Sequence, residues 1–94
     1  MITEDAFKYS ESSPPNWGLD RIDQLSLPLD NAYKYTYTGK GVYIFVIDSG
    51  INLQHEEYAS RAECGYSAVS GEDCQDYRGH GSHVSGIAAG TKVN

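Results

Sequence analysis

The segment GVYIFVIDSG, residues 41–50, gives the strongest indication of the fold of this chain. Residues 42–47 are all apolar or aromatic, with a glycine before them and an acid and a turn after them. A short run of this kind is typical of a β-strand. Because no polar residue alternates with the apolar ones, we expect both faces to be covered. The sequence therefore predicts an α/β fold with a parallel central sheet and helices on both faces.

Asp48 follows this strand directly, at its predicted carboxyl end. Open α/β sheets place their ligands and their chemistry at that edge. An acid at this position is equally typical of a turn or a helix cap. The segment alone leaves both interpretations open.

A second stretch, RGHGSHVSGIAAG at residues 78–90, favours the chemical interpretation. Val84 and Ile87 lie at helical spacing among small residues, which predicts a helix packed closely on a sheet. Glycines on both sides of His80 predict a turn at the start of that helix, where the helix dipole disfavours the protonated imidazole. A buried Asp on one ring nitrogen would fix the tautomer and leave the other nitrogen to act as a base.

Together the two stretches resemble the subtilisin-like serine proteases (subtilases), and in particular their proteinase K-like branch. That family carries Asp-Thr/Ser-Gly around its catalytic Asp and His-Gly-Thr-His-Val-Ala-Gly around its catalytic His. This chain has Asp48-Ser49-Gly50 and His80-Gly81-Ser82-His83-Val84-Ser85-Gly86, with small residues exchanged for small ones at 82 and 85. Residues 17–24, WGLDRIDQ, also resemble the opening of the mature domain in that branch.

The resemblance implies a serine endopeptidase that hydrolyses peptide bonds through an Asp-His-Ser triad. Asp48 would be the orienting acid and His80 the general base. The family's nucleophile lies in a Gly-Thr-Ser-Met-Ala type of motif, which these 94 residues lack, as they lack the oxyanion-hole Asn. Ser49, Ser82 and Ser85 belong to motifs in which they pack, so we do not expect them to replace it.

Two hypotheses follow for the 94-residue chain, which alone is expected to be inactive. It is the N-terminal part of an active protease domain, or it is a truncated product or pseudoenzyme that acts as a binding module. We prefer the first, because a parallel sheet that lacks most of its strands would expose residues 42–47.

Other interpretations of the histidines are weaker. His80 and His83 could bind zinc together with Asp48, but paired zinc ligands on one helix more often have i, i+4 spacing with a Glu between them. The glycines around His80 lack the preceding strand and the Gly-Lys-Ser/Thr continuation of a phosphate-binding loop. We expect His83 to pack or to hydrogen-bond to a neighbouring strand. His55, in HEEYASRA, resembles a structural histidine of the family.

A calcium site is the one metal site that the resemblance implies. Calcium prefers six to eight oxygen ligands. Some proteinase K-like enzymes bind it at positions that match four side chains here, Asp20, Asp23, Gln24 and Asp30, with a further ligand at the position of Ala32. Helix caps and surface salt bridges are the more common explanation of such acids. No cofactor is expected for the chemistry itself.

Residues 1–16 are polar, contain Pro14-Pro15 and are predicted to be a tail or linker. By resemblance they include the end of an inhibitory propeptide, although an ordinary frayed terminus is an equal alternative. Residues 17–94 are predicted to form the N-terminal part of a subtilisin-like peptidase domain. Within them we expect a helical turn at 17–24 and an acidic, solvent-facing loop at 63–77.

Residues 31–37 are expected to form a short helix or a loop. Their alternating tyrosines, at 33, 35 and 37, are also typical of a half-exposed strand.

The two cysteines, Cys64 and Cys74, lie in a polar region. Their pairing would close a short loop in an oxidising compartment. Free thiols, or partners elsewhere, are equally consistent with the sequence. In related proteases a cysteine just before the His motif often pairs further downstream, which would leave Cys74 without its partner here.

Composition narrows the range of partners. The net charge of −6 argues against nucleic acid or an anionic membrane. No segment is apolar for long enough to cross a bilayer, and the first residues, MITED, lack the basic and apolar regions of a signal peptide. The resemblance implies protein or peptide substrates, an inhibitory propeptide and a secreted protein.

Overall fold

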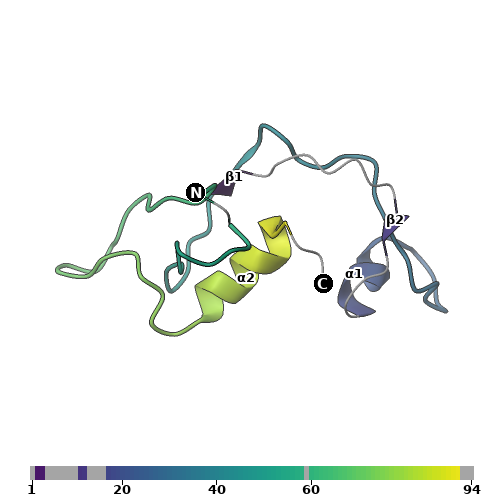
Figure 1. Ribbon diagram of the computed structural model, residues 1–94. Coiled ribbons are helices and arrows are strands. Elements are labelled where there is room, and N and C mark those ends of the chain that lie inside the picture. Colours follow the sequence, from purple (N-terminus) through teal and green to yellow (C-terminus); the bar gives the residue numbers. More distant parts are fainter. Residues whose placement is uncertain (1, 4–10, 13–16, 59, 92–94) are drawn as a thin grey trace.

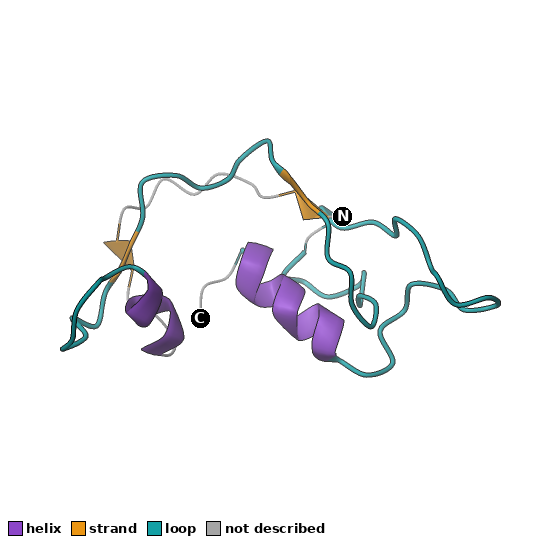
Figure 2. Ribbon diagram, turned by 180° about the vertical axis from the view of Figure 1, so that it is seen from behind, coloured by secondary structure: helices purple, strands orange, loops and turns teal. Residues whose placement is uncertain are grey.

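The computed structural model describes residues 2–3, 11–12, 17–58 and 60–91. Its elements are, in chain order, β1 (Ile2–Thr3), β2 (Glu11–Ser12), α1 (Trp17–Ile22), β3 (Tyr33–Lys34), β4 (Tyr43–Ile44) and α2 (His80–Ala89) (Figure 1). Long loops and turns connect these helices and strands (Figure 2). The two helices confirm the predictions for the segments that begin at Trp17 and near His80. Strand β3 takes the place of the short helix or loop expected at 31–37.

The strands form two short antiparallel pairs. Ile2 of β1 lies opposite Ile44 of β4, and Glu11 of β2 lies opposite Lys34 of β3. The predicted parallel central sheet is therefore not formed among the described residues. A parallel pair needs a long crossover to a second strand, whereas an antiparallel pair needs only a reversal of the chain.

The apolar run at residues 42–47 is covered on one face only. Ile44 packs against the core, but Phe45 is 73% exposed and Ile47 is 99% exposed. The expectation that both faces are buried, with helices on each, is therefore wrong for the described part of the chain. The reason is that α2 and the loop around Tyr58 supply cover on a single side, so the alternate residues face solvent.

The core lies between α2 and the segment that follows the apolar run. Tyr58 and Ala89, each 2% exposed, form its centre, and three half-buried residues pack against them: Ile44, Ile51 and Ala62. The Tyr58 hydroxyl donates to the carbonyl oxygen of Ser82 at 2.5 Å. At the other end of α2, the Arg61 guanidinium donates to the Ala89 carbonyl oxygen at 2.7 Å, which satisfies an acceptor that the helix leaves open.

The molecule is elongated, measuring 48 × 24 × 20 Å. Helix α1 and the β2–β3 pair lie at one end, α2 and the β1–β4 pair lie nearer the middle, and the green loop that precedes α2 reaches the other end (Figure 1). The predicted calcium ligands and the predicted catalytic residues are consequently far apart. No helix in the described ranges is long and apolar enough to cross a membrane.

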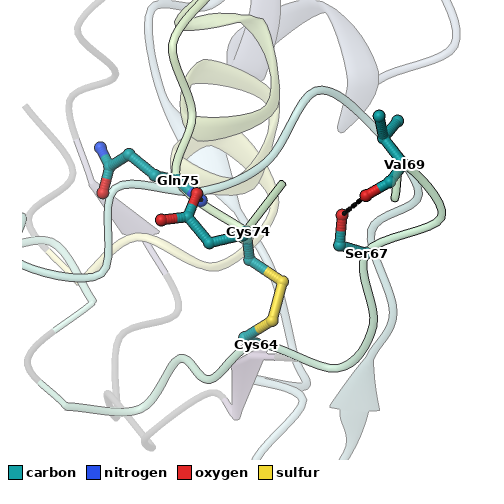
Figure 3. Close-up of a disulfide and its surroundings, with 6 residues drawn as sticks. Cys64, Ser67, Val69, Cys74 and Gln75 are labelled. Atoms are coloured by element: carbon teal, nitrogen blue, oxygen red, sulfur yellow. Dashed lines mark hydrogen bonds between the residues drawn. A yellow bond between two sulfur atoms is a disulfide. The ribbon is translucent and has the colours of Figure 1, made fainter. Parts of the chain in front are cut away.

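A disulfide joins Cys64 to Cys74 and closes the acidic loop between them (Figure 3). Of the alternatives that the sequence left open, pairing within the chain is the one observed, and the expectation that Cys74 lacks its partner is wrong. Most residues of the loop are exposed, as predicted. The Ser67 hydroxyl donates to the Val69 carbonyl oxygen within it.

Candidate active site

The turn at Asp48–Gly50 is held by the segment that follows the disulfide. Gly50 has φ 121°, in the region that favours glycine, and a Cβ atom on it would lie 2.6 Å from the Cys74 carbonyl oxygen. The amide of Ile51 donates to that same oxygen at 2.8 Å. Glycine is therefore required at position 50 for two reasons, the backbone angle and the close approach.

Gly79 and Gly81 place His80 at the first turn of α2. Gly79 has φ 87° and is the residue from which the helix begins, as its carbonyl oxygen accepts the amide of His83 at 3.0 Å. A Cβ atom on Gly81 would lie only 2.1 Å from the Gly50 carbonyl oxygen. The backbones of the two turns are thus in direct contact, and this contact brings His80 to Asp48.

His80 Nδ1 lies 2.8 Å from Asp48 Oδ1 and 3.0 Å from Asp48 Oδ2. The Asp48 side chain is 20% exposed, and that of His80 is 72% exposed. Asp48 also accepts the amide of Ser49 at 2.7 Å. The structure therefore brings together the two residues that the sequence singled out. Asp48 fixes one ring nitrogen and leaves Nε2 for other partners.

Each member of this pair shifts the pKa of the other. The hydrogen bond to Asp48 and its negative charge raise the pKa of His80 above its ordinary value of 6.5. The hydrogen bond from His80, with that from the Ser49 amide, lowers the pKa of Asp48. We expected the helix dipole to disfavour protonated His80, and that direction is wrong. A full charge in hydrogen-bond contact outweighs the roughly half charge of a helix end.

The other histidines lie apart from this pair. The amide of Glu57 donates to His55 Nδ1 at 3.1 Å, and the His55 ring lies 5.7 Å from that of Tyr58. This supports a structural role for His55. His83 is exposed on α2, so the expectation that it packs is wrong. Over the described ranges, no group of three or more metal-binding side chains includes a histidine.

Two of the three serines in these motifs have hydrogen-bond partners, and the third is buried. The Ser49 hydroxyl donates to Asp76 Oδ1 at 2.9 Å, and the Ser82 hydroxyl accepts the amide of Asn52 at 2.9 Å. Ser85 lies on the buried face of α2 and is 1% exposed. The contacts of Ser49 and Ser82 and the burial of Ser85 support the expectation that none of the three serves as a nucleophile.

Asp76 is a site residue that the sequence did not single out. It falls in the loop that we expected to be solvent-facing, yet its carboxylate lies between the Asp48 turn and the start of α2. The signal that predicts such a residue is an Asp placed shortly before a helix start, where it accepts free amides.

Three of the four predicted calcium ligands come together at the other end of the molecule. Oxygens of Asp20, Asp23 and Asp30 all lie within 4.8 Å of one another. Asp20 is 2% exposed, and one buried oxygen each of Asp20 and Asp23 has no hydrogen-bond partner. Uncompensated carboxylate oxygens at this density fit a hard divalent cation such as calcium.

The surrounding loop supports these carboxylates. Asp20 accepts the Asn31 amide at 2.7 Å, and Asp30 accepts the ammonium of Lys34 at 2.6 Å, which lowers the pKa of Asp30. Gln24 lies beside this cluster: its amide nitrogen donates to two loop carbonyls, and its oxygen accepts the amide of Asp30 at 3.2 Å. Gln24 therefore shapes the loop that carries Asp30.

Comparison with known proteins extends these observations. Residues 39–94 match the Subtilase family. The chain is 51% identical over 84 residues to an extracellular serine proteinase of a Thermus species, covering 88% of this chain and 20% of that protein. It is 49% identical over 76 residues to the alkaline serine exoprotease A of Vibrio alginolyticus, covering 80% and 14%. Subtilisin-like protease 6 of Trichophyton schoenleinii is 39% identical over 82 residues, covering 87% and 20%.

The chain thus spans about a fifth or less of the length of these relatives. No solved structure is significantly similar to it.

Proposed function

This chain belongs to the subtilase family, and we propose on that premise that it supplies the orienting acid and the general base of a serine endopeptidase. Asp48 is the acid and His80 is the base. The observation that carries the proposal is the 2.8 Å contact between His80 Nδ1 and Asp48 Oδ1. The family has an α/β fold, of which residues 17–94 would form the N-terminal part of the peptidase domain, in the manner of the proteinase K-like branch.

The geometry supports a defined role for each atom. Asp48 accepts a hydrogen bond from the Nδ1–H of His80, so that the neutral imidazole keeps its proton on Nδ1 and its lone pair on Nε2. Nε2 would remove the proton of a serine hydroxyl as that oxygen attacks a peptide carbonyl, and would then pass it to the leaving amine. The proposal places the serine and the oxyanion-hole Asn outside these 94 residues, which alone are expected to be inactive.

The exposure of His80 supports the proposal that the other catalytic groups lie outside these 94 residues. His80 is 72% exposed, whereas bases in working active sites are usually shielded from water. We infer that other parts of the protease domain and the substrate cover His80. Substrates would be proteins or peptides, and residues 1–16 would include the end of an inhibitory propeptide. Secretion is proposed because relatives are named as an extracellular proteinase and an exoprotease.

We further propose that Asp20, Asp23 and Asp30 hold a structural calcium ion. Calcium would supply the positive charge that the unpartnered oxygens of Asp20 and Asp23 lack. It would stabilise the loop after α1 and take no part in the chemistry. Gln24 would contribute by holding that loop in shape.

One observation favours a second candidate function. Phe45 and Ile47 are exposed apolar side chains. Exposed apolar surface of this kind is typical of a binding module whose partner is absent. In this alternative the Asp48–His80 pair is an inherited feature of an inactive chain.

Labelling with a fluorophosphonate probe distinguishes the two functions. The full-length protein should react covalently through its serine, and His80→Ala should abolish the labelling. His83→Ala is the matched control, because His83 lies on the same helix and is exposed. Equal labelling of both variants would contradict the assignment of His80, and absence of labelling in the unaltered protein would favour the binding module.

A further inference from the structure

The Asp76 carboxylate connects the two segments that carry the catalytic pair. Its Oδ1 accepts the hydroxyl of Ser49 at 2.9 Å, the amide of Gly79 at 2.8 Å and the amide of Arg78 at 3.1 Å. Its Oδ2 accepts the amide of Ser82 at 2.8 Å. One carboxylate therefore binds the residue that follows Asp48 and residues on both sides of His80.

Ser49 completes the connection. Its hydroxyl donates to Asp76 and accepts the amide of Gly81 at 3.0 Å. Asp76 and Ser49 together satisfy amides in the first turn of α2 that the helix itself leaves without partners. Because Ser49 is adjacent to Asp48 in the chain, each of these hydrogen bonds constrains the distance between Asp48 and His80.

The charge of Asp76 is maintained by the same hydrogen bonds. Removal from water acts to raise the pKa of this carboxyl, but the Ser82, Gly79 and Ser49 donors outweigh it, and the pKa lies well below its ordinary value. The negative charge also contributes to the raised pKa of His80, after the larger effect of Asp48. Asp48 and Asp76 are the two acids that act on the imidazole.

We propose that Asp76, acting through Ser49 and the first turn of α2, is a positioning residue that sets the geometry of the Asp48–His80 pair. This inference rests on the proposed function, because the pair matters for catalysis only in a protease. In the described part of the chain, the hydrogen bonds to the Asp76 carboxylate come from the Ser49 hydroxyl and from backbone amides, and none comes from the imidazole. The effect of Asp76 reaches His80 through the backbone amides of Gly79 and Gly81 and through its charge.

Substitutions separate positioning from a general effect on folding. Asp76→Asn keeps the size of the side chain but removes its charge and presents an amide N–H to one of its donors. Ser49→Ala removes the hydroxyl, whereas Ser49→Thr keeps it. Asp73→Asn is the matched control: Asp73 lies in the same loop and accepts only the nearby Gln75 amide in the observed contacts.

The experiment uses the full-length protein and two readouts. Hydrolysis of a peptide p-nitroanilide gives kcat and KM, and NMR titration of His80 gives its pKa. Misalignment of the pair should lower kcat roughly 10- to 100-fold in Asp76→Asn and Ser49→Ala, with KM within about twofold of the unaltered value. Asp76→Asn should also lower the pKa of His80. Ser49→Thr should restore kcat, and Asp73→Asn should change neither readout.

Two results would overturn the proposal. In one, Asp76→Asn leaves kcat and the titration of His80 unchanged. In the other, kcat falls only in proportion to the loss of folded protein, while His80 titrates as before. If the unaltered protein hydrolyses nothing, the proposed function fails, and the His80 titration in Ser49→Ala still tests the inference. This variant keeps the charge of Asp76, so the pKa of His80 should fall only if the connection through Ser49 positions the pair.

Discussion

His80 and Asp48 are joined through a single ring nitrogen that faces both carboxylate oxygens, at 2.8 and 3.0 Å. This arrangement favours the protonated imidazole and the ionised carboxylate, which gives activity and stability a defined dependence on pH. The base must be neutral to accept a proton.

The first prediction concerns the acid limb of activity. Because Asp48 raises the pKa of His80, kcat/KM of the full-length protein should rise with pH around a midpoint above the ordinary value of 6.5. A pH–rate profile on a peptide substrate measures this midpoint. A midpoint at or below 6.5 would show that the pair does not exist in the active enzyme.

The folding stability of the protein should depend on the protonation of the same two residues. Because the pKa of His80 is raised, this residue contributes stability that is fully present below pH 6.5 and is lost as the pH rises through its folded-state pKa. Because the pKa of Asp48 is lowered, this residue contributes stability that is fully present above pH 3.8 and is lost as the pH falls through its folded-state pKa. The contribution of the pair should therefore be largest between these limits. Denaturation midpoints of His80→Ala and the unaltered protein should differ most there and converge at alkaline pH.

Asp48→Asn should lower kcat by about 10⁴-fold, because an amide at this position favours the wrong tautomer of His80. KM should change little, since Asp48 faces the imidazole. Steady-state kinetics on the peptide p-nitroanilide provide the test, with Asp73→Asn as the control for loss of a loop carboxylate. Retention of a tenth or more of the activity would contradict the role given to Asp48.

Gly81→Ala should destabilise the protein by about 1–3 kcal/mol, the usual cost of forcing an extra group into a packed site. The new Cβ atom would lie 2.1 Å from the Gly50 carbonyl oxygen, a backbone atom that cannot move aside independently. Gly86→Ala is the control in the same helix, where a Cβ atom meets nothing within 4 Å. That change should stabilise α2 by about 0.5–1 kcal/mol. Equal effects of the two changes on urea denaturation would refute the close contact.

The calcium proposal predicts that Asp20→Asn is less stable than the unaltered protein in calcium but not in EDTA. At about 100 times its dissociation constant, calcium should stabilise the unaltered protein by roughly 2.7 kcal/mol, and Asp20→Asn should abolish this gain. In EDTA the variant should be at least as stable as the unaltered protein, because it removes one of three neighbouring charges. Thermal melts with and without calcium give both comparisons, and Glu72→Gln, in the exposed loop, should retain the full calcium response. An unaltered calcium response in Asp20→Asn would reject the site.

Replacing both cysteines by serine should lower the free energy of unfolding by about 2–3 kcal/mol, the value that chain entropy gives for a loop of this length. The sequence separation of the bridge is 10 residues. Guanidinium denaturation measures the loss, and Ser67→Ala, which removes only one hydrogen bond inside the loop, should cost far less. A loss equal to that of Ser67→Ala would mean that the bridge does not constrain the unfolded chain.

Local sequence patterns were sufficient to predict the elements whose conformation depends mainly on neighbouring residues. Glycines on either side of His80 predicted the turn at the start of α2, and small residues at helical spacing predicted the helix. Asp20, on α1, and Asp23 and Asp30, in the segment that follows, come together because they are close in the sequence. The sequence did not decide whether Cys64 pairs with Cys74, since pairing within the chain, free thiols and partners elsewhere are all consistent with the spacing of the two cysteines.

The family of this chain, and Asp48 and His80 as candidate site residues, could be predicted from the sequence, because short motifs specify both. The tertiary structure alone decided which faces are covered and which residues support the pair. Residues 42–47 look fully buried in sequence, but burial depends on what packs against them, and α2 covers one side only. Asp76 looks like one acid among several in a loop, and the role that we propose for it depends on the fold, which brings Ser49 and the first turn of α2 to the same carboxylate.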